Sequence, residues 1–247
     1  MNDNNNIYIT LDLDWASDEI IEFTLDILEK ENICATIFIT HYTKLLDRMR
    51  SNSKIELGIH PNFNKILSGE TNNKCYINVI EEMMKIVPEA KSARSHSITQ
   101  NSSILNTFSA VGIKYDVNTY LPIHSGINMR PWVHSNNNLI RVPYFWEDDV
   151  QCLEFENGLV DTWNPLKWVE SQNDIKVFNF HPIHLFLNTE NMDRYEKSRN
   201  VHRDFQMLSK YVNSTVYGTK DFFKDLIKYA ELEKFKFRKI CNIGQNI

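Results

Sequence analysis

The sequence lacks the features that mark several large classes of proteins. Its four cysteines lie far apart and form no C-x-x-C pair, so neither a structural zinc knot nor a disulfide framework is expected. No apolar run is long enough to cross a membrane, and the first residues are polar rather than apolar. From these absences we predict a cytoplasmic protein without a membrane span.

Blocks of like charge and repeated segments are missing as well. The 247 residues carry a net charge of −5, which argues against nucleic acid or an anionic membrane as the main partner. With 42% hydrophobic and 12% aromatic residues, the chain can bury a sizeable core, and this excludes global disorder. We see no linker and no low-complexity run, so we predict one domain over residues 1–247. The oligomeric state stays open.

Strand and helix patterns alternate along the chain. Short β-branched or continuously apolar runs predict strands, and apolar residues at helical spacing predict helices. The predicted strands span residues 7–13, 33–39, 55–59, 90–95, 113–117, 139–144 and 176–180, and the predicted helices include 18–28, 44–50, 76–87, 103–111, 165–170 and a helical tail within 193–247. About seven strand–helix units in a chain of this length favour a parallel (β/α) barrel.

Two carboxylates, Asp12 and Asp14, end the first predicted strand. Residues two apart in a strand point to the same face, so these side chains repel each other and lose solvation. A metal ion between them, or a shared proton, would relieve the repulsion. The alternative is that Asp14 begins a turn and Asp12 caps a neighbouring segment, because Asp is common at strand ends.

Polar side chains also follow other predicted strands, namely His60, Arg94, His96 and His181. The carboxyl ends of the strands are where a β/α barrel builds its active site. Asp and His ligands suit zinc or a similar divalent ion, which can make a water acidic enough to attack a carbonyl. That chemistry also needs a base, an acid for the leaving nitrogen and a group that keeps the base ionised. Asp12, His181 and Arg94 are suitable residue types for these tasks.

At this point the chain resembles the NodB-type polysaccharide deacetylases, carbohydrate esterases that remove N- or O-acetyl groups from sugars. The segment Thr10-Leu11-Asp12-Leu13-Asp14 is similar to the first motif of that family. The resemblance implies that Asp12 is the general base and that Asp14 is a metal ligand.

The second motif of the family has two ligand histidines with three residues between them. His60-Pro61-Asn62-Phe63-Asn64 lies in the corresponding place, with Asn64 where the second histidine is usual. The resemblance therefore implies a metal on Asp14, His60 and Asn64. His96 or His184 is an alternative third ligand.

Three further motifs are looser matches. Arg94-Ser95-His96-Ser97 resembles the third motif, whose arginine orients the base, although the usual Pro and Tyr after it are absent. Tyr144 to Asp149 resembles the fourth motif, an acidic and aromatic groove wall, which makes Trp146 and Asp148 candidates for substrate contact. His181 matches the fifth motif, whose histidine protonates the leaving group, and His184 could take that role instead.

The resemblance covers residues 7–188 and implies a distorted (β/α) barrel of the NodB type. It implies a metal-dependent hydrolase, with zinc as the expected divalent ion. The reaction would remove an acetyl or other acyl group from an N-acetylated sugar, such as a surface-polysaccharide precursor.

Two other functions stay open. A barrel that binds sugar but has lost catalysis would fit the change at Asn64 and the altered third motif. Another metal-dependent hydrolase, such as an amidohydrolase or a deaminase, fits less well. That group usually has His-x-His after its first strand, where this chain has Asp-x-Asp.

Overall fold

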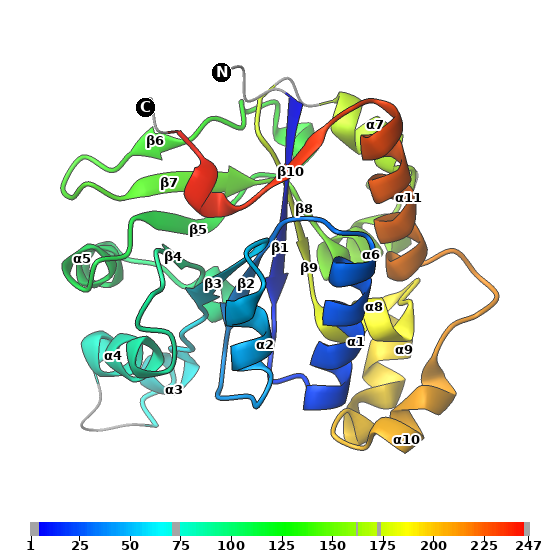
Figure 1. Ribbon diagram of the computed structural model, residues 1–247, viewed down its shortest axis with the longest axis horizontal. Helices are drawn as coiled ribbons and strands as arrows, with labels where there is room; N and C mark the ends of the chain where they lie inside the picture. The colour runs from blue at the N-terminus through cyan, green and yellow to red at the C-terminus, as the bar shows by residue number, and fades with distance from the viewer. Residues whose placement is uncertain (1–4, 71–74, 162, 172–173, 245–247) are drawn as a thin grey trace.

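A ten-stranded sheet forms the centre of the fold (Figure 1). The computed structural model describes residues 5–70, 75–161, 163–171 and 174–244. The ends of the predicted domain, 1–4 and 245–247, therefore lie outside the described residues. The strands run in the order β6-β7-β5-β4-β3-β2-β1-β9-β8, with β10 beside β1. Their bounds are β1 (Asn6–Asp12), β2 (Ala35–Ile39), β3 (Ile55–Ile59), β4 (Ser92–Ala93), β5 (Tyr115–Tyr120), β6 (Trp132–Val133), β7 (Ile140–Tyr144), β8 (Trp146–Glu147), β9 (Lys176–Phe180) and β10 (Lys236–Arg238).

The sheet is parallel except at one edge, where β6 pairs antiparallel with β7. It curls so that β7 contacts β9, which confirms the predicted distorted (β/α) barrel. The strand number is a correction, since about seven strands were predicted and ten are present. The unpredicted strands β6, β8 and β10 have two or three residues each. Runs that short show no readable alternation.

Helices connect the strands and cover the sheet. Figure 1 shows α1 and α2 in front of it, α4 and α5 at the left and α11 at the right. The helices are α1 (Asp18–Lys30), α2 (Leu46–Ser51), α3 (Asn64–Leu67), α4 (Tyr76–Ile86), α5 (Ser102–Ala110), α6 (Asp148–Glu156), α7 (Pro165–Glu170), α8 (Pro182–Leu187), α9 (Met192–Ser198), α10 (Phe205–Leu208) and α11 (Thr219–Leu232). Among the described residues, none of them is both long and apolar enough to span a membrane.

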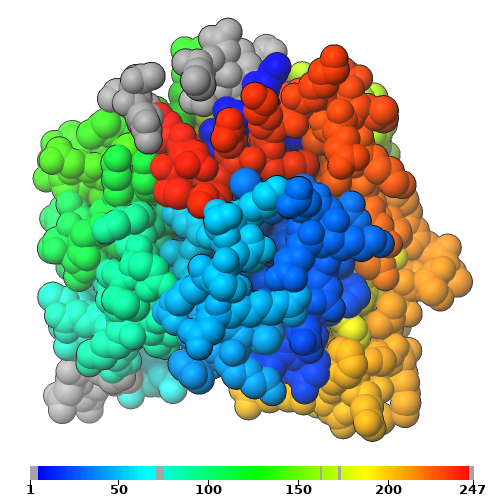
Figure 2. Space-filling view, viewed as in Figure 1, coloured from blue at the N-terminus to red at the C-terminus, as the bar shows by residue number. Residues whose placement is uncertain are grey.

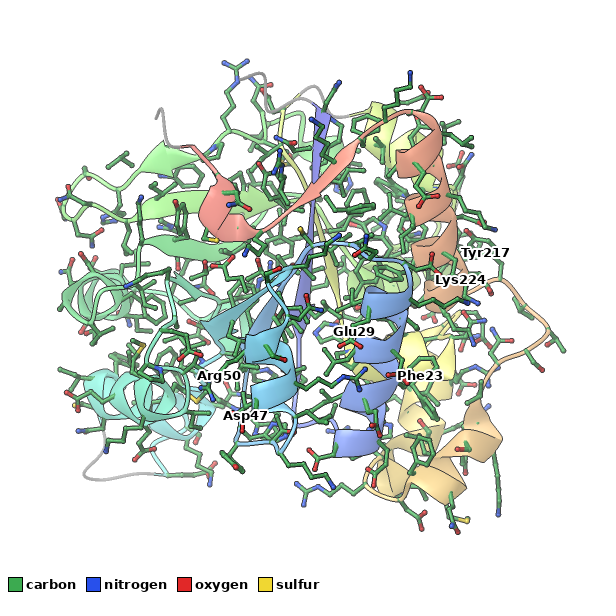
Figure 3. The ribbon with its side chains drawn as sticks, viewed as in Figure 1. Phe23, Glu29, Asp47, Arg50, Tyr217 and Lys224 are labelled. Carbon is green, nitrogen blue, oxygen red and sulfur yellow. The ribbon has the colours of Figure 1, made fainter. Side chains whose placement is uncertain are left out.

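Helix α1 forms because its apolar residues repeat at helical spacing. All of the apolar positions predicted for its inner face are buried, namely Ile20, Ile21, Thr24, Leu25 and Leu28. Its outer face carries acidic residues, and Arg48 of α2 donates to Asp26 and Glu29 there. Figure 3 shows Glu29 of α1 and Asp47 and Arg50 of α2 on this exposed face. The burial of one face thus holds α1 against the sheet.

The C-terminal segment returns to the first strand, which corrects the prediction that the tail within 193–247 is helical to its end. After α11, β10 pairs in parallel with the start of β1, with Asn6 opposite Lys236. Figure 2 shows the C-terminal segment in red beside the blue N-terminal atoms. The buried carboxylate of Glu56 accepts hydrogen bonds from Thr36 and from the backbone N–H of Cys241. The chain's last described turn is therefore tied to β2 and β3.

The stretch 118–138, which lies between the predicted strands 113–117 and 139–144, is partly ordered as strand. Strand β5 continues through Tyr120, and β6 lies within the same stretch. Polar residues such as Asn118 and Thr119 gave no strand pattern. Asn118 is nevertheless buried, and its amide nitrogen donates to Asp116 at 2.6 Å. The tertiary contacts of the side chains make this polar segment a strand.

Candidate active site

The carboxyl ends of β1, β3, β4 and β9 meet at one edge of the sheet, which we call the carboxyl edge. Strand pairing sets which residues become neighbours there. Ile59 pairs with Ala93, which places His60 beside Arg94. Leu11 pairs with Phe180, which places Asp12 beside His181. Parallel pairing thus gathers side chains that are up to 169 positions apart in the chain.

Asp14, His60 and His96 form the first group at this edge. One oxygen of Asp14, Oδ1, lies 3.2 Å from His60 Nε2 and 3.2 Å from His96 Nδ1. The ligand atoms of the three residues lie within 4.8 Å of one another. Asp14 and Trp15 have φ angles of 40° and 57°, a conformation that is rare for residues other than glycine. This turn directs the Asp14 carboxylate toward both histidines.

The charge of Asp14 is stabilised by its surroundings. Burial would raise the pKa of the Asp14 carboxyl, but hydrogen bonds from His60 and His96 and the nearby charge of His181 lower it far below its ordinary value. The other ring nitrogen of His60, Nδ1, is buried and lacks a hydrogen-bond partner among the described residues. The Nε2 atom is therefore the one that faces Asp14. Two imidazole nitrogens and one carboxylate converging in this way fit a catalytic zinc site.

Asn64 lies apart from this group. Its side chain is exposed, it is the first residue of α3, and its backbone N–H donates to Asn62 Oδ1 at 2.8 Å. His96, which follows β4, occupies the position beside Asp14 and His60 instead. The geometry favours His96 over Asn64 as the third ligand.

Asp12 is buried beside Asp14 and His60 and is held by two donors. Arg94 Nη1 donates to its Oδ1 at 3.1 Å, and Asn179 Nδ2 donates to its Oδ2 at 3.0 Å. Arg94 is itself 1% exposed and lies over the ring of Tyr144 at 4.3 Å. Because the guanidinium cannot reach water, its charge acts on Asp12 with little screening. The arrangement suits a carboxylate that must stay ionised.

His181 is oriented by Asp148, the first residue of α6. The backbone N–H of His181 donates to Asp148 Oδ2 at 2.8 Å, and His181 Nδ1 lies 2.7 Å from Asp148 Oδ1. Burial alone would lower the pKa of His181, but Asp148, Asp149 and Asp14 outweigh it and raise the pKa well above its ordinary value. The imidazolium form is therefore the stable one near neutral pH, with Nε2 as the nitrogen that faces the open cleft.

Two further groups of His and acidic residues have ligand atoms within 4.8 Å of one another. One contains Asp148, His181 and His184, all buried. In it both oxygens of Asp148 already bond to His181, and His184 Nδ1 lies 3.0 Å from Thr189 Oγ1. His184 is thus placed next to the predicted acid rather than next to Asp14. The other group contains Asp12, Glu147 and His181.

Two adjoining cavities of about 230 Å³ each open onto these residues. Both are lined by Asp14, His96, Asp149 and His181. Trp15, which is 39% exposed, lines the first cavity. A larger cavity of about 570 Å³ lies between α7 and α11, beside Tyr217 (Figure 3). Its lining includes Trp163 but none of the residues predicted from the sequence to be catalytic or to bind a metal.

The structure corrects the prediction that Trp146 contacts substrate. Trp146 is 2% exposed, and its ring stacks on Phe222 with centroids 4.3 Å apart. Its Nε1 donates to Gln151. It is a core residue. Of the polar members of the same motif, Glu147 and Asp149 line the cleft, whereas Asp148, also a predicted substrate contact, is buried and bonds to His181.

Asn179 escaped the sequence analysis, and Glu147 was included only as part of the Tyr144 to Asp149 motif, without a role of its own. Asn179 Nδ2 donates to both Asp12 and Glu147, while Asn179 Oδ1 accepts from Thr10 at 2.8 Å and from Arg94. A signal was available, because Asn179 is polar within the apolar run 177–180 and lies two positions before His181. Residues two apart share a strand face. Glu147 gave no such signal, because it adjoins other acidic residues.

Comparisons with known proteins agree with this geometry. A profile of the WbmS-like family, described as polysaccharide deacetylases, matches residues 9–199. The WbmS protein of Bordetella bronchiseptica, described as a candidate polysaccharide deacetylase involved in O-antigen biosynthesis, is 37% identical. The match covers 93% of this chain and 100% of that one, with a TM-score of 0.84. The comparison with curated proteins gave no match.

More distant structures share the fold. The catalytic domain of a peptidoglycan N-acetylglucosamine deacetylase from Eubacterium rectale is 15% identical, with 96% of this chain and 88% of that chain covered and a TM-score of 0.50. The Xyl-CE4 domain of a xylanase from the hindgut metagenome of Trinervitermes trinervoides is 13% identical, with 96% and 87% covered and a TM-score of 0.50. At these identities the likeness concerns the fold alone.

Proposed function

The chain belongs to the WbmS-like polysaccharide deacetylase family, and from this premise we propose that it is a metal-dependent hydrolase that removes an acetyl group from an N-acetylated sugar. One observation carries the proposal. A three-ligand group, a base paired with arginine and an acid paired with aspartate all meet at the carboxyl edge. Each is a part that metal-assisted hydrolysis of an amide requires.

In this proposal Asp14, His60 and His96 hold a divalent ion. The donor set of one oxygen and two nitrogens suits zinc, and three protein ligands leave a position open. The ion, when bound, would supply a Lewis acid that makes a water more acidic and polarises the acyl carbonyl. Asp14 keeps its negative charge through its contacts with His60 and His96, so the group is prepared for a cation.

Asp12 serves as the general base. It accepts the proton of the attacking water, and Arg94 and Asn179 hold its two oxygens in place. Arg94 stays charged at all relevant pH values, and its positive charge lies against the Oδ1 atom of Asp12 through their hydrogen bond. His181 serves as the general acid and gives its Nε2 proton to the leaving nitrogen. Asp148, bonded to Nδ1, fixes the ring orientation and supports the imidazolium.

The third ligand can be tested with a pair of variants. His96→Ala removes an imidazole nitrogen from the group. Loss of a residue that contacts a ligand but not the metal usually lowers affinity by about 10- to 100-fold, and we expect zinc affinity to fall by more than that. Asn64→Ala changes an exposed side chain and should leave zinc affinity unchanged. Titration against a competing chelator measures both. If Asn64→Ala weakened zinc binding and His96→Ala did not, the assignment would be reversed.

The relative from Bordetella bronchiseptica points to a sugar of a surface polysaccharide as the substrate, because it is described as involved in O-antigen biosynthesis. We propose an acylated, nucleotide- or lipid-linked precursor, in keeping with the cytoplasmic location predicted from the sequence. The aromatic Trp15 and the acidic groups of the cleft provide one apolar face and several hydrogen-bond acceptors for such a sugar.

Release of acetate tests the function directly. The zinc-loaded protein is incubated with UDP-N-acetylglucosamine and, separately, with N-acetylglucosamine oligomers, and acetate and free amine are measured. We expect equal amounts of both products with at least one substrate, and none after zinc is removed by a chelator. Sugar binding without acetate would instead favour the barrel that has lost catalysis.

A further inference from the structure

Glu147 is a carboxylate of the cleft that has no role in this mechanism. It is the last residue of β8, its side chain is 14% exposed, and it lines one of the two cavities together with Asp12 and His181. Its Oε1 accepts from Asn179 Nδ2 at 2.8 Å, and its Oε2 accepts from the hydroxyl of Tyr144 at 3.1 Å. Glu147 is therefore held in one position beside the two proposed proton-transfer groups.

The distance to His181 defines a small site. Glu147 Oε1 lies 3.9 Å from His181 Nε2. Hydrogen bonds from nitrogen are about 2.7–3.2 Å long. One substrate atom can therefore lie within hydrogen-bond distance of both Glu147 Oε1 and His181 Nε2. The other ring nitrogen of His181 bonds to Asp148, which leaves Nε2 as the proton donor. The atom that receives the proton from His181 is thus the atom that Glu147 can contact.

The surroundings of Glu147 favour binding of a cation, because without one the ionised carboxylate is unfavourable. Burial raises the pKa of Glu147 to about 8, and Asp149 adds to the effect. A positive group would stabilise the ionised form of Glu147, since opposite charges attract strongly in a partly buried site. An amide and an ester differ here, because an amide releases an amine that becomes an ammonium ion while an ester releases a neutral hydroxyl.

We propose that Glu147 is a specificity residue that pairs with the amino group set free at His181 and so selects N-acylated over O-acylated sugars. This inference rests on the proposed deacetylase function and names the bond that is cleaved. The oxygen of water joins the acyl carbon while Asp12 takes one proton of the water, and His181 gives one proton to nitrogen as the C–N bond breaks. The proton on Asp12 then returns to His181, and the proton of the acid product goes to the amine, so the final products are acetate and an ammonium ion. Glu147 transfers no proton and accepts an N–H hydrogen bond.

A metal ion is the competing occupant, because Asp12, Glu147 and His181 are spaced closely enough to bind one. Against this, Asp12 already accepts from Arg94 and Asn179, and Glu147 accepts from Asn179 and Tyr144. A metal at this position would also take the His181 nitrogen that must deliver a proton. Metal stoichiometry separates the two occupants.

The test uses Glu147→Gln, which keeps the shape of the side chain and removes its charge. The probes are methyl 2-acetamido-2-deoxyglucoside and methyl 2-O-acetylglucoside, which differ only in the bond cleaved. We expect kcat/KM for the amide to fall by about 10- to 100-fold, the size of a lost hydrogen bond to a charged group. For the ester, kcat/KM should change far less. Glu156→Gln, an exposed residue of α6, is the control with a matched change of charge.

Other outcomes overturn the inference. Equal losses of kcat/KM on amide and ester would mean that Glu147 only positions Asn179 and Asp12. Loss of bound zinc from Glu147→Gln would mean that Glu147 is a ligand.

If the wild type released acetate from neither probe, calorimetry with methyl 2-amino-2-deoxyglucoside and methyl glucoside decides instead. Tighter binding of the amine by the wild type than by Glu147→Gln supports the pairing, and equal binding refutes it. Failure of the proposed deacetylase function can thus be distinguished from failure of the proposal for Glu147.

Discussion

Asp12→Asn is expected to lower kcat by about 10²–10⁴-fold, the usual contribution of a general base, while the protein keeps its full complement of metal. The variant has the same shape as the wild type, so Asn179 and Arg94 stay close to it. A neutral amide cannot accept the proton of the attacking water. Acetate release gives the rate, and elemental analysis gives the metal content.

The metal content decides between two roles for Asp12. If Asp12→Asn lost its metal, Asp12 would be a ligand and the roles of Asp12 and Asp14 would have to be exchanged. A rate close to that of the wild type would leave Asp12 without a part in proton transfer. Asp26→Asn, an exposed carboxylate of α1, makes the same chemical change away from the cleft and should keep the wild-type rate.

Asp14→Ala is expected to abolish metal binding and, with it, activity. It removes the oxygen that both His60 and His96 approach at 3.2 Å, so only two ligands would remain. Metal affinity should fall by more than the about 10- to 100-fold that is typical when a residue contacting a ligand, rather than the metal, is removed. Elemental analysis after dialysis measures the stoichiometry, and circular dichroism checks that the fold is retained.

His60→Ala should behave in the same way as Asp14→Ala. Full metal stoichiometry in either variant would show that the ion is held elsewhere. The groups with Asp148, His181 and His184 and with Asp12, Glu147 and His181 would then be the places to search. Adding His181→Ala to the comparison separates the first group from these two, because it removes a member of both and leaves the first group complete.

The family resemblance was readable because polar residues follow strands that the sequence marks clearly. Strands β1, β2, β3 and β9 were predicted within two residues of their bounds in the structure. An apolar run such as residues 33–39, in which Thr36 is the one polar residue, has few alternatives to a buried strand. Once the strands are parallel, their carboxyl ends share one edge of the sheet, and this brings Asp12, His60, Arg94 and His181 to the same site.

The third ligand could not be chosen in this way. Asn64 lies four residues after His60, and a helical turn starting at His60 would have brought both to one ion. The helix starts only at Asn64, whose side chain is exposed. His96 reaches the site because β3 pairs with β4, a contact between segments that the local pattern does not connect.

The sequence by itself determined the fold class, the family resemblance and the presence of Asp12, Asp14, His60, Arg94 and His181 at the carboxyl edge, because these depend on local periodicity and on residue type. The tertiary structure alone decided that His96 joins Asp14, that Asn179 links Asp12 to Glu147, and that Trp146 belongs to the core. Each of these depends on strand register and helix packing between distant segments. Such contacts are set by the whole chain, since no short segment contains both partners.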